Sequence, residues 1–216
     1  VTFLKNNHGK FENITMQSGI SNQTGWWNSI TAGDFDNDGD MDYIVGNLGQ
    51  NSFFRANDKY PVNLYAKDFD NNGSLEQVMA YTINGEEYPF LAKDELERAL
   101  PVLKKAYLNY SDVAGKTVQY LFYDLFKNYV ELKAEVLGSS VFINDGKGKF
   151  SLRDNAIPVS VRTIAGTVSA GDYDNDGDLD LFIGGRVARQ YPLSPRSFIL
   201  QNNDGVFSDV TQKVCA

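Results

Sequence analysis

Three loops of the chain carry oxygen-bearing side chains at regular spacing. Each loop has such side chains at its first, third, fifth and ninth positions and a glycine at its sixth. In a tightly coiled loop this alternation directs the groups toward one centre, and a main-chain carbonyl at the seventh position can add another oxygen. Hard oxygen donors in this number suit Ca²⁺ better than Zn²⁺ or Mg²⁺. The predicted metal-binding residues are Asp34, Asp36, Asp38, Asp40 and Asp42; Asp68, Asp70, Asn72, Ser74 and Glu76; and Asp172, Asp174, Asp176, Asp178 and Asp180.

The residues that follow these loops argue against an EF-hand. An EF-hand loop needs a bidentate acid at position 12 and helices on both sides. Position 12 is Val45, Met79 or Ile183, and each lies in a strand-like alternation. A single Asp-Asn-Asp-Gly string could be a solvated turn, but three copies that each end in a carboxylate at position nine favour metal binding. We therefore expect up to three Ca²⁺ ions, with the second loop, where Asn72 and Glu76 replace Asp, as the least regular site.

A second element also repeats and predicts β-hairpins. Each copy is an apolar run, a turn rich in Asn, Asp and Gly, and an aromatic residue where the next strand begins. The copies occupy 4–11, 142–150 and 200–207. Because the chain alternates acidic-loop hairpins with hairpins of this second type, a pair of them makes one four-stranded unit.

The resulting strands are placed on both sides of each acidic loop. We expect them near 29–34 and 42–47, 62–67 and 76–83, 164–171 and 179–184, and 197–201 and 206–210. The first fifteen residues predict a leading hairpin from a preceding unit. The expected fold is mainly β: a partial β-propeller of four-stranded antiparallel blades, about three blades plus the leading hairpin, with an α-helical insertion.

The insertion is expected at 86–137, where the apolar period changes from two residues to a helical one. Two amphipathic stripes mark it, with Asp94 as a predicted N-cap and Pro101 as a predicted break. The stripes are Leu96, Leu100, Leu103 and Tyr107, then Val118, Leu121, Phe122, Leu125 and Phe126. This divides the chain into 1–85 with the leading hairpin and first two metal loops, the helical insertion 86–137, and 138–216 with the third metal loop.

Composition restricts the function. The formal net charge is −8, but the acids are concentrated in the three loops and no basic stripe is present, which argues against nucleic-acid binding. No apolar run is long enough to span a bilayer. The single cysteine, Cys215, cannot form an intramolecular disulfide, and the single histidine, His8, lies in a predicted turn. Nucleophilic catalysis therefore lacks its usual residues, and no catalytic residue is predicted.

The acidic loops carry a family resemblance. The string Gly33 to Met41 followed by Asp42-Tyr43-Ile44-Val45-Gly46, with its repeat at 171–184, resembles the FG-GAP (VCBS) repeat of integrin-α-like β-propellers. The unit from Pro61 to Asn144 further resembles secreted bacterial FG-GAP proteins that carry an ASPIC/UnbV domain, although that domain is not visible in this sequence. The resemblance implies blades of four antiparallel strands whose first two strands are linked by a Ca²⁺ loop.

The predicted function is a calcium-stabilised, non-catalytic binding or interaction module of an exported protein, in the periplasm, at the cell surface or outside the cell. The expected partner is a protein or glycan, and open propeller edges offer a route to self-association. The alternatives are a carbohydrate-binding propeller and the scaffold of a polysaccharide-active enzyme. Candidate ligand contacts are Trp26 and Trp27, of which one should face outward, and Arg186 and Arg189 in a basic loop.

Overall fold

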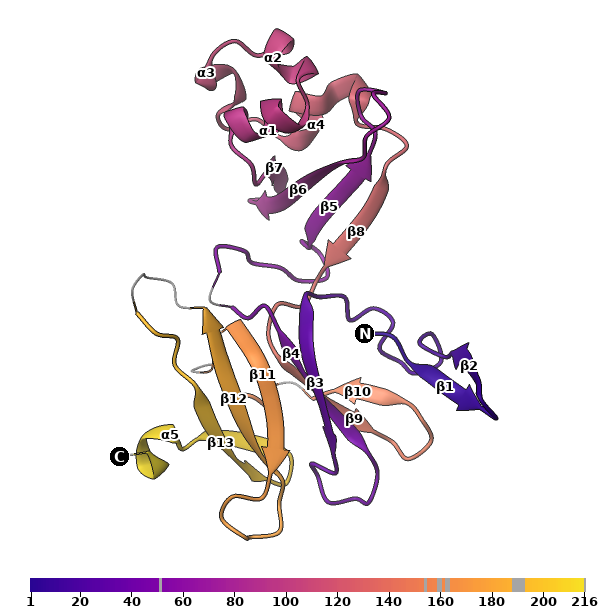
Figure 1. Ribbon diagram of the computed structural model, residues 1–216, viewed down its shortest axis with the longest axis vertical. Helices are drawn as coiled ribbons and strands as arrows, with labels where there is room; N and C mark the ends of the chain where they lie inside the picture. The colour runs from indigo at the N-terminus through magenta and orange to yellow at the C-terminus, as the bar shows by residue number, and fades with distance from the viewer. Residues whose placement is uncertain (51, 154, 159–160, 162–163, 188–192, 216) are drawn as a thin grey trace. The chain divides into compact units, whose positions relative to one another are not determined.

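The computed structural model describes the whole chain except residues 51, 154, 159–160, 162–163, 188–192 and 216. Three four-stranded antiparallel sheets and one two-stranded hairpin dominate, so the mainly β prediction is confirmed. The chain divides into two compact units (Figure 1). The first unit consists of Val1–Phe53 and Leu137–Ala216, and the second of Phe54–Val136.

The first sheet of the first unit is assembled from two distant parts of the sequence. Its strands are β3 (Trp27–Gly33), β4 (Asp42–Asn47), β9 (Ser140–Asn144) and β10 (Phe150–Leu152). They lie in the order β10-β9-β4-β3, so the second unit is inserted between the two central strands. The register of β4 with β9 pairs Tyr43 with Phe142 and Val45 with Ser140. The amide of Gly49 donates to the carbonyl of Leu137 at 2.8 Å, which brings the two ends of the insertion together.

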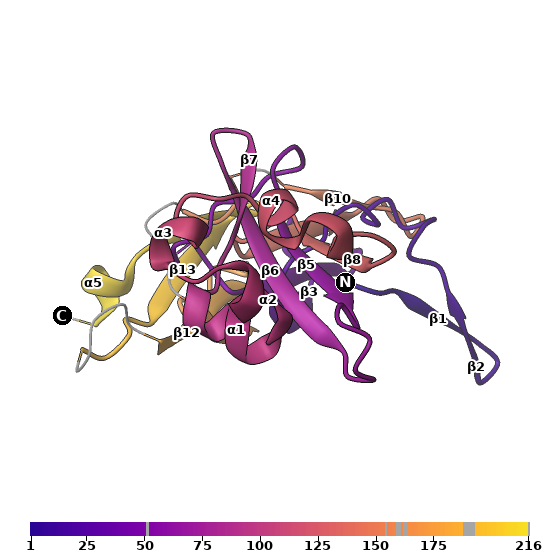
Figure 2. The same cartoon turned by 90° about the horizontal axis from the view of Figure 1, so that it is seen from above.

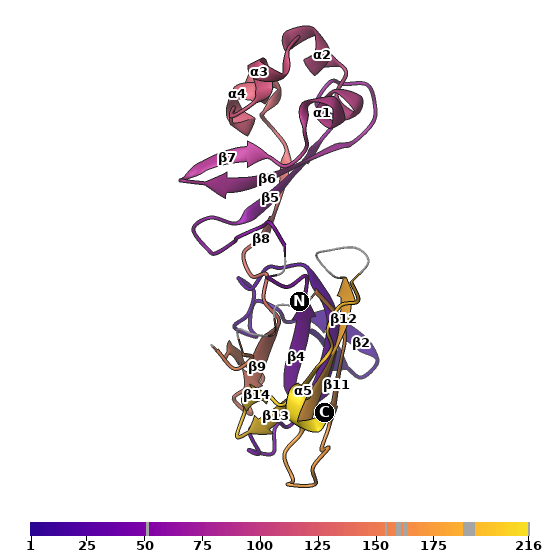
Figure 3. The same ribbon diagram turned by 90° about the vertical axis from the view of Figure 1, so that its left-hand side faces the viewer.

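The second sheet of the first unit is continuous in sequence. It comprises β11 (Ile164–Gly171), β12 (Asp180–Val187), β13 (Phe198–Asn203) and β14 (Val206–Asp209), in that order. The two sheets share one hydrophobic core, in which Ile44 and Val141 of the first sheet and Phe35 of the loop after β3 pack with Leu181 and Leu200 of the second sheet. In Figure 3 the strands of both sheets run side by side. This arrangement is that of two neighbouring propeller-like blades.

A hairpin precedes the first sheet and a short helix follows the second. β1 (Leu4–Asn7) and β2 (Lys10–Asn13) pair only with each other, as a two-stranded sheet. The helix α5 spans Thr211–Val214. The leading hairpin that the sequence predicts is therefore present.

The second unit places helices over one face of a sheet. Its strands are β5 (Val62–Lys67), β6 (Glu76–Ile83), β7 (Glu86–Pro89) and β8 (Val130–Ala134), in the order β7-β6-β5-β8. Its helices are α1 (Lys93–Ala99), α2 (Val102–Ala106), α3 (Tyr110–Val113), α4 (Val118–Phe122) and the 3₁₀ turn η1 (Tyr123–Leu125). Leu96, Leu100 and Phe122 pack on Tyr65 and Val78. The helices gather on one side of β5–β7 (Figures 1 and 3).

The helical stripes and the break at Pro101 agree with the sequence pattern, but the first helix begins earlier than predicted. Its N-cap is Ala92 instead of Asp94. The Glu95 carboxylate accepts the Ala92 amide at 3.0 Å and so closes the first turn of the helix.

The insertion is larger than its helical pattern indicates. The sequence predicts an insertion at 86–137 and assigns the second acidic loop to a propeller blade, whereas the compact second unit begins at Phe54. The difference is one of pairing. The hairpin β5–β6 has the same alternation as a blade hairpin, but β8 joins it next to β5, and the partner of β4 is β9. Alternation alone does not reveal which strands pair.

A compact unit with its own core should fold by itself. We expect residues 54–136, expressed alone, to unfold cooperatively in a circular-dichroism melt. Leu100→Ala, at a fully buried position, should lower the free energy of unfolding by about 2–5 kcal/mol. Val102→Ala, at an exposed position, is the matched control. A non-cooperative melt of the isolated unit would contradict its independence.

Candidate metal centres

The three acidic loops share one backbone path. The fourth residue of each loop has a left-handed conformation, with φ of 59° at Asn37, 58° at Asn71 and 60° at Asn175. The glycine at position six also has positive φ, between 89° and 96°. Asn and Gly are the residues that adopt this region at least cost, so both identities follow from the turn itself.

The carboxylate at the first position closes each loop from within. Asp34 accepts the amides of Asp38 at 3.2 Å and Gly39 at 2.9 Å. Asp68 accepts the corresponding amides in the second loop at 3.0 and 2.8 Å, and Asp172 those in the third, both at 3.2 Å. The side chain at position one is thereby held over the loop centre.

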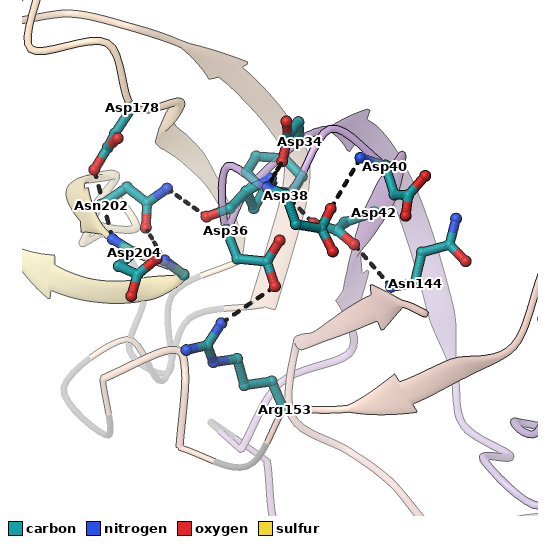
Figure 4. A network of polar contacts seen from close by, with 12 residues as sticks. Asp34, Asp36, Asp38, Asp40, Asp42, Asn144, Arg153, Asp178, Asn202 and Asp204 are labelled. Carbon is teal, nitrogen blue, oxygen red and sulfur yellow. Dashed lines mark hydrogen bonds and ion pairs between the residues drawn. The ribbon is translucent and has the colours of Figure 1, made fainter. Parts of the chain in front are cut away.

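The carboxylate at the ninth position is buried and connects the loop to the sheet. One oxygen of Asp42 accepts the amide of Phe35 at 3.0 Å, and the other accepts the amide of Asn144, in β9, at 2.8 Å (Figure 4). Asp180 repeats this arrangement, accepting the amides of Tyr173 at 3.1 Å and Asn202 at 2.8 Å. Each of these two aspartates therefore joins its loop to the third strand of the blade.

Three carboxylates converge in each loop. Oxygens of Asp34, Asp36 and Asp42 lie within 4.8 Å of one another, as do those of the matching residues in the other two loops. The matching sets are Asp68, Asp70 and Glu76, and Asp172, Asp174 and Asp180. Two oxygens bound to one Ca²⁺ lie no more than about 5 Å apart, so the convergence fits this ion.

Asp36 supplies a second test of whether the loop residues fit a bound Ca²⁺. Its Oδ1 atom is buried and has no hydrogen-bond partner in the described part of the chain. Burial, followed by the charges of Asp42 and Asp38, raises the pKa of Asp36. Burial also raises the pKa of Asp42 and of Asp180. A cation at the centre would give the orphaned oxygen a partner and offset the repulsion, so the residues present fit a bound Ca²⁺.

The side chains at the fifth and seventh positions lie outside these three-carboxylate clusters. Asp38 accepts the amide of Asp40 at 2.9 Å, and Asp176 accepts that of Asp178 at 3.0 Å. Asn72 accepts the amide of Ser74 at 2.7 Å. The fifth side chain thus orients the seventh residue, whose predicted contribution is its main-chain carbonyl.

The first and third loops touch each other across the two blades. The side-chain amide of Asn37 donates to Asp178 Oδ1 at 2.5 Å, and the amide of Asp204 donates to Asp178 Oδ2 at 3.5 Å. Arg153 lies 3.8 Å from Asp36 (Figure 4). The two loops of the first unit are therefore parts of one polar network.

The second loop keeps the geometry but not the connection to a third strand. Glu76 replaces aspartate and still accepts the amide of the second loop residue, Phe69, at 2.8 Å. The next strand, β7, pairs with β6 from Ala80 to Ile83, away from Glu76. The substitution that makes the second loop irregular in sequence thus preserves the internal hydrogen bond.

The other predicted contacts lie apart from the loops. Trp27 packs edge-to-face on Phe142 at 5.9 Å, and its indole donates to the carbonyl of Gln23, so this partly buried ring lies against the core cluster. Trp26 is half-buried next to it. Arg186 lies in β12, and Arg189 lies outside the described residues. His8 occupies a turn with φ of 51°, as its sequence context predicts.

Sequence reasoning missed Asn144 and Asn202, whose amides hold the ninth carboxylate. A signal was available, because the second repeated element has an asparagine at the same place in every copy, including Asn6. The cross-loop role of Asn37 had no such signal, since the contact depends on how the two blades pack.

Comparison with known families agrees with this geometry. Residues 1–45 and 137–183, together less than half of the chain, match the FG-GAP-like repeat. The two matched segments flank the second unit and include the first and third loops. No curated protein and no solved structure matches the chain. The match to the FG-GAP-like repeat thus lies within segments of the first unit. Among the described helices, none has the length and apolar character to cross a membrane.

The raised pKa of Asp36 predicts a pH-dependent effect of its charge in the metal-free protein. Because the folded pKa lies above the ordinary value of 3.8, the folded state binds more protons between the two values. The contribution of Asp36 to stability therefore decreases as the pH rises through that interval. In a chelator at pH 7, Asp36→Asn should unfold at a higher temperature than the parent chain. The difference between the two melting temperatures should disappear as the pH falls to 3.8. A difference in melting temperature that is constant with pH would contradict this prediction.

Proposed function

We propose that the chain is a calcium-stabilised FG-GAP repeat segment that acts as a non-catalytic interaction module of an exported protein. The observation that carries the proposal is the repetition of one loop geometry with a buried ninth carboxylate. Three loops in two separate units keep it. The expected partner of the module is a protein or a glycan.

Calcium would stabilise the folded state of the blade. The proposed ligands are the converging carboxylates and the carbonyl of the seventh residue. A bound ion supplies positive charge that offsets the repulsion among these carboxylates. The ninth carboxylate then remains ionised and holds the amide of the third strand, so binding is coupled to the completion of the blade.

The carbohydrate-binding alternative has less support from the site it would use. The packing of the partly buried Trp27 ring against Phe142 engages one of the two rings proposed to stack on a sugar. The turn conformation of His8 gives no support to a catalytic role in a polysaccharide-active enzyme. The interaction module therefore remains the proposed function.

Calcium should raise the melting temperature of both units. A site filled at one hundred times its Kd adds about 2.7 kcal/mol to the free energy of unfolding. Asp34→Ala should weaken the response of the first unit, and Asp68→Ala that of the second, in hydrogen exchange resolved by residue. Asp58→Ala, an exposed acid outside the loops, is the control. Equal melting in calcium and in chelator would overturn the proposal.

The contact between Asn37 and Asp178 should couple calcium binding at the first and third loops. In a chain whose second loop is disabled by Asp68→Ala, we expect binding to the other two loops to be cooperative by calorimetry. Asn37→Gly should reduce the coupling by about threefold to tenfold, the range for loss of one hydrogen bond. Asn175→Gly is the matched control, since Asn175 has the same φ and does not bond to the first loop. Cooperativity that survives Asn37→Gly would contradict the role of this contact.

A further inference from the structure

The strand β8 lies at one edge of the sheet in the second unit. Its inner side pairs with β5, in a register that places Leu132 opposite Leu64 and Glu131 opposite Tyr65. No other described strand pairs with β8. Figures 1 and 2 show β5 on one side of β8 and no strand of the second unit on the other. The outer side of β8 therefore presents backbone amide and carbonyl groups to a further strand.

The two faces of β8 differ in character. Tyr65 packs with the helices in their core cluster, so Glu131, directly opposite Tyr65, lies on the helix-covered face together with Lys133. The Lys133 ammonium lies 3.7 Å from the Glu131 carboxylate. Val130 and Leu132 lie on the other face and are 61% and 56% exposed. The edge thus carries one charge of each sign on one face and exposed apolar side chains on the other.

The opposite edge of the same sheet is protected by its sequence. That edge is β7, which contains Glu86, Glu87 and Pro89. Proline has no amide to donate to a neighbouring strand, and a surplus of acids repels an equivalent strand. β8 has neither a proline nor a surplus of one charge. Of the two edges of this sheet, β8 is therefore the one suited to pairing.

We propose that β8 pairs with β8 of a second copy of the chain, antiparallel about a two-fold axis at Leu132. In this register Glu131 of each copy lies opposite Lys133 of the other, so the charges alternate in sign along and across the two strands. On the other face, Leu132 lies opposite its own equivalent and Val130 lies opposite Ala134. The sheets of the two second units then form one continuous sheet.

The charges of β8 select this register and this occupant. A two-fold axis at Glu131 would place two glutamates opposite each other, and an axis at Lys133 would place two lysines opposite each other. Like charges in directly opposed positions are destabilising, whereas opposite charges and apolar pairs are stabilising. An edge lysine usually opposes pairing with a foreign strand, but here it meets a glutamate. A second copy is therefore favoured, because β8 is complementary to its own reversed sequence.

The pairing goes beyond the proposed function. It uses an edge of the inserted unit instead of a propeller edge, and it involves neither the acidic loops nor a protein or glycan partner. Its success or failure is therefore measured separately from the response to calcium.

The first test is analytical ultracentrifugation of the full chain in calcium. We expect a monomer–dimer equilibrium at micromolar concentrations or above, because a strand of five residues forms a small interface. Glu131→Lys and Lys133→Glu should each weaken the dimer by about tenfold to a hundredfold, since both cross-strand charge pairs become repulsive. A mixture of these two variants should associate again, because the lysines of one then face the glutamates of the other. Glu86→Lys, at an exposed position of β7, is the matched control.

A cysteine cross-link tests the register. In a chain whose exposed Cys215 is replaced by serine, Leu132→Cys should form a disulfide-linked dimer under mild oxidation. Directly opposed residues of antiparallel strands have Cα atoms about 4.5–5.5 Å apart, which a disulfide can bridge. Val130→Cys is the control. It should cross-link much less, because its neighbour across the axis is Ala134.

A chain that stays monomeric at millimolar concentration would overturn the proposal. A dimer that Glu131→Lys leaves unchanged would overturn it too, as would a mixture of the two charge variants that stays monomeric while both keep the circular-dichroism melt of the parent. Equal cross-linking of Leu132→Cys and Val130→Cys would also contradict it. A chain that dimerises through β8 but melts equally in calcium and in chelator would support the pairing and overturn only the proposed function.

Discussion

A buried carboxylate at the ninth position of the acidic loop is the interaction on which each blade depends. In Asp42 and Asp180, two oxygens accept two amides, one from the loop itself and one from the third strand of the same sheet. An ionised carboxylate in a buried position is costly unless its oxygens are satisfied. The two amides meet part of this requirement, and the raised pKa of both aspartates shows that they do not meet all of it.

A cation at the loop centre would compensate the remaining negative charge of the buried carboxylate. The chemistry of the loop is in this way linked to the architecture of the sheet. The first and third positions bring further carboxylates to within 4.8 Å, where their mutual repulsion opposes folding without a counter-charge. Two consecutive residues, Asp34 and Phe35, serve the polar loop and the apolar core respectively. Phe35, directly after Asp34, is fully buried between the two sheets of the first unit. The loop is thereby anchored at one end by packing and at the other by Asp42.

Much of this arrangement could be predicted from the sequence because it depends on local spacing. The positions of the acids and glycines define the loops, and strands were expected within a few residues of their observed ends. Pairing between distant strands could not be predicted in this way. The hairpin β5–β6 has the pattern of a blade, yet β8 pairs with β5 and places it in a separate unit. The contact of Asn37 with Asp178 was likewise invisible, since it arises only when two blades pack together.

The measurement that tests the account most directly is the number of calcium ions that the chain holds, by equilibrium dialysis with metal analysis. The account predicts saturable binding of up to three ions, with one lost on Asp34→Ala, one on Asp172→Ala and one on Asp68→Ala. Each substitution removes the carboxylate that spans the loop centre in one site only. Absence of saturable binding at millimolar calcium, or an ion count unchanged by all three substitutions, would contradict it.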